Sequence, residues 1–155
     1  MTSCAREEDQ PSRPFICLEQ EAFLKLGRTW AVLEHAFSEG LKEHGITPTQ
    51  YNVLRILREV GERGLCRGEV TQRMIAKVPD ATRLLDRLEV AGLIERERAS
   101  ADRRFVTTRI TTEGLQVLAE LDGPVEALHR EHFGKLGEND LRRLIDLLGR
   151  VRTTL

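Results

Sequence analysis

The chain has 155 residues, enough for one domain with its own hydrophobic core and additional dimerisation arms. Charged residues make up 32% of it and aromatic residues 5%, a composition more typical of helical proteins than of β-sandwiches or β-barrels. The net charge of −1 does not indicate nucleic-acid binding by the molecule as a whole, but local patches decide electrostatic binding, so such binding is not excluded.

The amino-terminal region predicts a flexible tail followed by one long helix. Residues 1–14 are charged and contain two prolines, and they do not form a secretory signal. Over residues 15–45, apolar side chains recur at three- and four-residue steps, at Leu26, Trp30, Leu33, Phe37 and Leu41. Because no apolar run approaches the ~20 residues that span a membrane, we expect a soluble cytoplasmic protein without membrane contact.

Several short elements follow. Thr47 and Gln50 have the spacing of a capping box, with Pro48 at the first helical position, so a helix begins here. We expect its apolar face to contain Tyr51, Leu54 and Leu57. Downstream we expect a short strand at residues 65–67, helices at 68–77 and 79–91, and two strands at 94–98 and 106–110.

Two further helices complete the chain. Thr111 can cap the first, and Asp122-Gly123-Pro124 can bend it. Its apolar stripe is Leu115, Leu118, Leu121, Val125 and Leu128. The last helix spans about residues 138–152, with Leu141, Leu144, Ile145, Leu148 and Val151 on one side. The predicted fold class is therefore mainly α with a small β-hairpin.

The order of the central elements is that of a winged helix-turn-helix. Two short helices with a tight connection precede a hairpin, and the second helix of such a unit lies in the DNA major groove. Residues 79–91 would be this recognition helix. Between residues 77 and 109, eight basic residues outnumber six acidic ones, which favours an interaction with phosphates.

Four side chains of this helix are candidates for DNA contacts. Arg83 can recognise guanine through a bidentate contact, and Thr82 can contact a thymine methyl group or a phosphate. Asp80 can accept from a cytosine amine, and Arg87 can contact a phosphate. The alternative is that Arg83 and Arg87 form surface salt bridges with Asp86 or Glu89.

The hairpin tip carries Asp102, Arg103 and Arg104. Arginine suits the minor groove, where narrow A·T-rich segments concentrate negative potential. Asp102 can support the tip or orient a guanidinium. The alternative is an ordinary solvated turn.

Four stretches resemble the MarR (multiple-antibiotic-resistance regulator) family: "GITPTQYNVLRIL", "ATRLLDRLEVAGLIERE", "ADRRFVTTRITTEG" and the flanking long helices. The resemblance covers about residues 20–152. Asp102 and Arg104 match the family's D-x-R wing, and residues 79–87 match its recognition helix. At "KVPDATR" the chain departs from the usual start of that helix, which leaves its N-cap undecided.

The resemblance implies a homodimer that binds a pseudo-palindromic operator, usually as a repressor. Residues 46–111 would be the DNA-binding domain, and 15–45 with 112–155 the dimerisation region. It also implies an effector pocket near Phe23, Gly27, Arg28, Trp30 and His35, suited to an aromatic or anionic compound. The alternative for Trp30 is a place in the dimer core.

Other classes of function have weaker support. The odd count and irregular spacing of Cys4, Cys17 and Cys66 argue against a disulfide framework, although a thiol-responsive regulator stays open. Cys66 is expected to be a buried small hydrophobe. His129 and His132 have metal-ligand spacing but too few partners, so we expect surface histidines, no metal and no cofactor, with a metal-responsive regulator as the alternative. We find no catalytic motif and expect no enzyme; a winged-helix module that binds protein remains an alternative.

Overall fold

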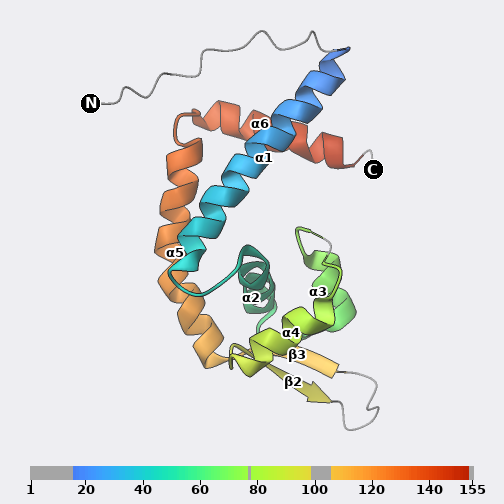
Figure 1. The fold of residues 1–155 in the computed structure, drawn as a ribbon, viewed down its shortest axis with the longest axis vertical. Coiled ribbons are helices and arrows are strands. Elements are labelled where there is room, and N and C mark those ends of the chain that lie inside the picture. Colours follow the sequence, from blue (N-terminus) through green and yellow to red (C-terminus); the bar gives the residue numbers. More distant parts are fainter. Residues whose placement is uncertain (1–15, 77, 99–105, 154–155) are drawn as a thin grey trace, which may run out of the picture. The chain divides into compact units, whose positions relative to one another are not determined.

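The computed structural model describes residues 16–76, 78–98 and 106–153. Its elements are α1 (Leu18–Lys42), α2 (Pro48–Val60), the 3-10 helix η1 (Gly61–Arg63), β1 (Leu65–Cys66), α3 (Arg67–Arg73), α4 (Ala81–Val90), β2 (Ile94–Arg98), β3 (Val106–Ile110), α5 (Thr112–Phe133) and α6 (Glu138–Arg152) (Figure 1). The mainly helical fold class with a small β-hairpin is confirmed. The chain divides into two units inside α1, between His35 and Ala36.

The three strands form one antiparallel sheet in the order β1-β3-β2. Strand β3 is central: Leu65 of β1 pairs with Thr108, and Ile94 of β2 pairs with Ile110. Both the hairpin and the short preceding strand follow the sequence prediction. The sheet thereby joins the end of α2 to the hairpin that follows α4.

Helix α2 begins as its capping residues predict. The Thr47 backbone N–H donates to Gln50 Oε1 at 2.9 Å, and the Gln50 backbone N–H donates to Thr47 Oγ1 at 3.2 Å. The helix is buried on more sides than the predicted face, because Asn52, Val53 and Ile56 are buried as well. Helices α3 and α5 and strand β3 all pack against it. The apolar periodicity therefore predicted fewer buried residues in this helix than the structure shows.

Asn52 has a structural role inside this core. Its Oδ1 accepts from the backbone N–H of Ile75 at 3.0 Å, in the segment between α3 and α4. The side chain is only 6% exposed, so this hydrogen bond offsets part of the cost of burying an amide. Asn52 thus fixes the connection between the two short helices.

Several helix boundaries differ from the sequence prediction by one to four residues. Helix α1 begins at Leu18 rather than at residue 15. Helix α3 ends at Arg73 and not at residue 77, because the backbone of Met74 is extended (φ −66°, ψ 143°). Helix α4 begins at Ala81 rather than at Pro79.

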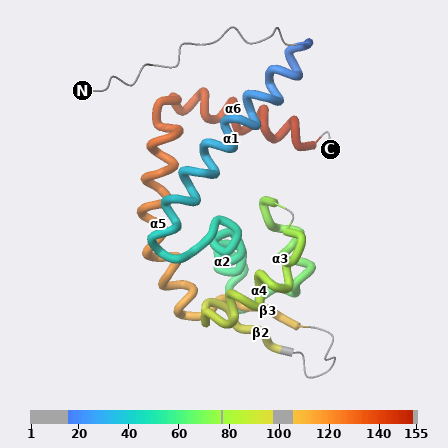
Figure 2. The backbone as a smooth tube through the Cα atoms, viewed as in Figure 1, coloured from blue at the N-terminus to red at the C-terminus, as the bar shows by residue number. Residues whose placement is uncertain are grey.

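Helix α5 continues through Pro124 as one helix, visible as an unbroken coil in Figure 2. Leu118, Leu121 and Val125 of its predicted stripe are buried, whereas Leu115 is 43% exposed. Its first turn approaches the α4–β2 connection closely. A Cβ built on Gly114 would lie 2.7 Å from Ile110 Cγ1 and would also clash with the Leu93 carbonyl oxygen, so only glycine fits there.

Helix α6 differs from the other long helices because none of its residues is buried. Ile145 is 69% exposed and Leu148 is 42% exposed, although both belong to the predicted apolar side. Within the described residues, no helix is long and apolar enough to cross a membrane. Burying such side chains stabilises a protein by roughly 1.5–3 kcal/mol each, and the exposed side chains of α6 do not gain this stabilisation within the chain.

Candidate nucleic-acid interface

Helix α4 has two contrasting faces. Leu85 and Leu88 are buried in the core, and Leu84 packs against it. Thr82, Arg83, Asp86 and Arg87 are exposed. The leucines thus anchor the helix while the four polar side chains point away from the core, and Thr82, Arg83 and Arg87 among them are predicted DNA contacts.

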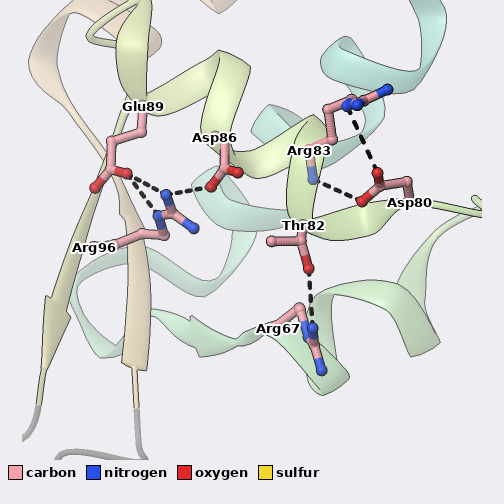
Figure 3. Close-up of polar contacts among 7 residues, drawn as sticks. All are labelled: Arg67, Asp80, Thr82, Arg83, Asp86, Glu89 and Arg96. Atoms are coloured by element: carbon pink, nitrogen blue, oxygen red, sulfur yellow. Dashed lines mark hydrogen bonds and ion pairs between the residues drawn. The ribbon is translucent and has the colours of Figure 1, made fainter.

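Asp80 is the N-cap of this helix. Its Oδ1 accepts from the Arg83 backbone N–H at 2.9 Å, and its Oδ2 lies 3.7 Å from Arg83 Nε (Figure 3). This settles the N-cap that the sequence left undecided and explains why Pro79 lies outside the helix. The Arg83 side chain is 72% exposed, so its guanidinium remains accessible.

The alternative that placed Asp86 and Glu89 in salt bridges with Arg83 or Arg87 is wrong. Arg96 of β2 contacts both carboxylates: Nη2 lies 2.5 Å from Asp86 Oδ1, Nε lies 2.8 Å from Glu89 Oε2, and Nη2 also contacts Glu89 (Figure 3). The hydrogen bond to Glu89 raises the pKa of the Arg96 guanidinium. Arg96 therefore joins the first strand of the hairpin to α4.

A second contact joins α4 to α3. The guanidinium of Arg67, the first residue of α3, donates from Nη1 to Thr82 Oγ1 at 2.9 Å (Figure 3). Both side chains are exposed. Arg67 was not among the predicted interface residues, because no periodic pattern connects residues on different helices. It nevertheless lies at the exposed N-terminal end of the candidate recognition helix.

The base of the hairpin is held by Arg109. Its Nε donates to the Glu62 carbonyl at 2.7 Å, and its Nη1 contacts Glu97 Oε2 at 2.8 Å. These contacts connect β3 to η1 and to β2. The predicted tip residues Asp102, Arg103 and Arg104 lie outside the residues that the structure describes.

The candidate effector residues lie on α1, in the first unit. Phe23 is 75% exposed and Trp30 is 53% exposed. Phe23, Gly27 and Trp30 recur at four- and three-residue steps, which places them on one face of the helix. Arg28 and His35 are also exposed.

The expected role of Cys66 is wrong. The residue is only half-buried and occupies the N-cap of α3, where its backbone N–H donates to Glu69 Oε2 at 2.8 Å. This bond holds the pKa of Glu69 below its ordinary value. Cys17 is exposed.

The two histidines of α5 differ in their surroundings. His129 is exposed and stacks on Phe37 with ring centroids 6.2 Å apart, whereas His132 is half-buried. The prediction of surface histidines therefore fits His129 better than His132. In the described part of the chain, no three His, Cys, Asp or Glu side chains form a group that could hold a metal ion.

Comparison with known proteins gives a consistent result. The model of the MarR family matches residues 44–104. The transcriptional regulator YkoM of Bacillus subtilis is 31% identical, over 84% of this chain and 86% of its own length. A MarR transcription factor from Planctomyces limnophilus is 36% identical and superimposes with a TM-score of 0.68, over 88% of this chain and 98% of that one.

A mutant MarR from E. coli, solved with operator DNA, is 27% identical with a TM-score of 0.72, over 87% of this chain and 98% of that one. These relatives are regulators and not enzymes. Their similarity extends over the winged helix-turn-helix and the flanking helices. Together with the exposed face of α4, it shows that this chain belongs to the MarR family of DNA-binding transcriptional regulators.

Proposed function

We propose that the protein is a homodimeric repressor that binds a pseudo-palindromic operator in the cytoplasm. The observation that carries the proposal is the exposed polar face of α4, with Thr82 and Arg83 at its N-terminal end and Leu85 and Leu88 fixing it to the core. N-terminal residues of a recognition helix are those that reach base edges in the major groove. Two such helices would enter successive major grooves about 34 Å apart.

The individual contacts follow the side-chain chemistry. Arg83 would recognise guanine and Arg87 would contact a phosphate. Asp80 would accept from a cytosine amine only through the part of its carboxylate that its capping bond leaves free. Arg103 and Arg104, supported by Asp102, would contact the minor groove beside the recognition helix.

Pairing would use the flanking helices. The exposed apolar side chains of α6 support an interface with a second copy, because two-fold dimers are the commonest assemblies. Residues 46–111 would then form the DNA-binding domain between dimerisation segments at 15–45 and 112–155. Sedimentation analysis at several concentrations tests this arrangement, and a concentration-independent monomer would contradict it.

An aromatic or anionic effector would release the DNA. Phe23 and Trp30, with Arg28, Gly27 and His35 nearby in the sequence, offer aromatic surface and positive charge on α1. Release requires that the effector bind the DNA-incompatible conformation better than the DNA-bound one. Because Trp30 is the one tryptophan of the chain, its fluorescence reports directly on an aromatic carboxylate probe such as benzoate.

The decisive experiment is fluorescence-anisotropy binding to DNA upstream of the protein's own gene, compared with a scrambled duplex at two salt concentrations. Selection of sequences from a random DNA pool covers the case of a remote operator. A specific regulator binds its operator tightly and the scramble weakly, and both affinities fall steeply with salt. Equal binding to all sequences, or none, would contradict the proposal.

A further inference from the structure

Two threonines of the helix-turn-helix use their hydroxyl groups in opposite ways. Thr71 of α3 donates its hydroxyl to the backbone carbonyls of Arg67 at 3.2 Å and Gly68 at 2.8 Å. Thr82 of α4 instead accepts from Arg67 Nη1 at 2.9 Å. Across the described residues, the Thr82 hydroxyl donates to no acceptor within hydrogen-bonding distance.

The partner of Thr82 decides which role its hydroxyl has left. A threonine hydroxyl carries one hydrogen and two lone pairs, whereas a guanidinium can only donate. While Arg67 occupies a lone pair, the hydroxyl hydrogen must point elsewhere. In the described residues, the neighbouring Asp80 carboxylate does not accept it; its two oxygens lie 2.9 Å from the backbone nitrogen and 3.7 Å from Nε of Arg83.

The free hydrogen lies where a recognition helix meets base edges. Thr82 is the second residue of α4 and is exposed. In the major groove, the acceptors are guanine N7 and O6, adenine N7 and thymine O4, whereas the cytosine and adenine amines are donors. With one lone pair occupied by Arg67, the hydroxyl keeps its hydrogen and only one other lone pair, so donation to the first group is favoured over acceptance from the second.

We propose that Arg67 is a specificity-determining positioning residue, which orients the Thr82 hydroxyl so that it donates to a base acceptor in the operator. This inference rests on the proposed function. It identifies one residue pair that sets the protein's preference for an operator sequence. Arg67 acts from α3, through Thr82. Its effect is on which base is preferred and not only on affinity.

The experiment measures competition binding against every single base-pair variant of an operator selected by the wild-type protein. Thr82→Val keeps the shape of the side chain and removes the hydroxyl. It should reduce the preference at one position of each half-site by about fivefold or more. Arg67→Met should reduce the preference at that same position, and the double variant should lose no more there than Thr82→Val alone.

Two further variants separate orientation from charge. Arg73→Met removes a positive charge from the other end of α3. It should lower the affinity for all sequences by the same factor and leave the base preference unchanged. Arg67→Lys keeps the charge and a donor, and should restore part of the preference. Melting curves for all variants establish that they are folded.

Three results would overturn the inference. Arg67→Met could weaken binding to all sequences equally, as the loss of a phosphate contact would. Thr82→Val could leave the base preference unchanged at every operator position. The losses of preference in the two single variants could also add in the double variant. If the wild-type protein enriches no sequence at all, the proposed function fails together with this inference. If the wild type enriches an operator and the Arg67 result differs from expectation, only this inference fails.

Discussion

The Arg58 guanidinium of α2 and the Asp122 carboxylate of α5 form a bidentate ion pair. Arg58 Nη1 lies 2.8 and 3.0 Å from the two carboxylate oxygens, and Nη2 lies 3.0 Å from one of them. The hydrogen bond to Asp122 raises the pKa of the arginine. The pair joins the central helix of the winged domain to the long helix that follows it.

Removing the charge of Asp122 should therefore destabilise the α2–α5 packing. Because the two side chains are 35% and 52% exposed, we expect Asp122→Asn to lower the free energy of unfolding by only about 0.5–1 kcal/mol. Urea unfolding measures the change. Glu126→Gln on the same helix is the control, since its pair with Arg130 lies within one helix and should contribute about 0.5 kcal/mol or less. Equal losses would show that the bridge between helices has no special role.

Arg96 should contribute more than an ordinary surface arginine. Its side chain is 24% exposed and neutralises both Asp86 and Glu89, so Arg96→Met leaves two carboxylates close together without a cation. We expect a loss of about 1–2 kcal/mol in urea unfolding. Arg142→Met removes an equivalent side chain from an exposed pair with Glu138 and should cost about 0.5 kcal/mol or less. The expectation fails if the two variants unfold alike.

Gly114 should not tolerate a side chain. Alanine there would press its Cβ against Ile110 and the Leu93 carbonyl, so Gly114→Ala should destabilise the protein by about 1–3 kcal/mol. Gly40→Ala is the matched control, because nothing lies within 4 Å of a Cβ at that position. Since alanine favours helix more than glycine does, the control should hold or raise the melting temperature. A stable Gly114→Ala protein would mean that α5 can shift away from the α4–β2 connection.

Acid should weaken the start of α3. The Cys66 backbone N–H donates to the Glu69 carboxylate and holds the pKa of that carboxyl below its ordinary value of 4.5 in the folded state. A depressed folded-state pKa adds stability above the ordinary value, and this stability is lost as the pH falls through the folded-state pKa. The stability difference between wild type and Glu69→Gln should therefore shrink below about pH 4.5 in urea unfolding. A difference that stays constant from pH 7 to pH 3 would contradict this account.

The sequence predicts those features that depend on neighbours along the chain. The capping box of Thr47 and Gln50 joins residues three positions apart, and the strands of the β2–β3 hairpin follow one another in the chain, so both can be predicted from local patterns. The family resemblance added the expected homodimer, the pseudo-palindromic operator and the effector pocket. Both sources give the fold class and the location of the recognition helix.

Side-chain contacts between different helices and strands could not be predicted from the sequence. The Arg67–Thr82 hydrogen bond, and the pairing of Arg96 with Asp86 and Glu89, join side chains that no pattern connects. Asp86 and Glu89 had two candidate arginines on their own helix, and the sequence offered no reason to prefer a strand residue. The start of α4 also differs from the prediction, because Asp80 and Pro79 were both possible starting signals and the structure uses Asp80 as the N-cap.

The buried and exposed faces of α4 consist of different residues, so the exposed face can be substituted separately from the core. Leu85 and Leu88 hold the helix in place, while Thr82, Arg83 and Arg87 take no part in the core. Surface substitutions away from special features usually alter stability by only about 0.5 kcal/mol. A library randomised at these three exposed positions should therefore consist mostly of folded proteins, and selection of that library against new operators would test whether these residues set the sequence preference.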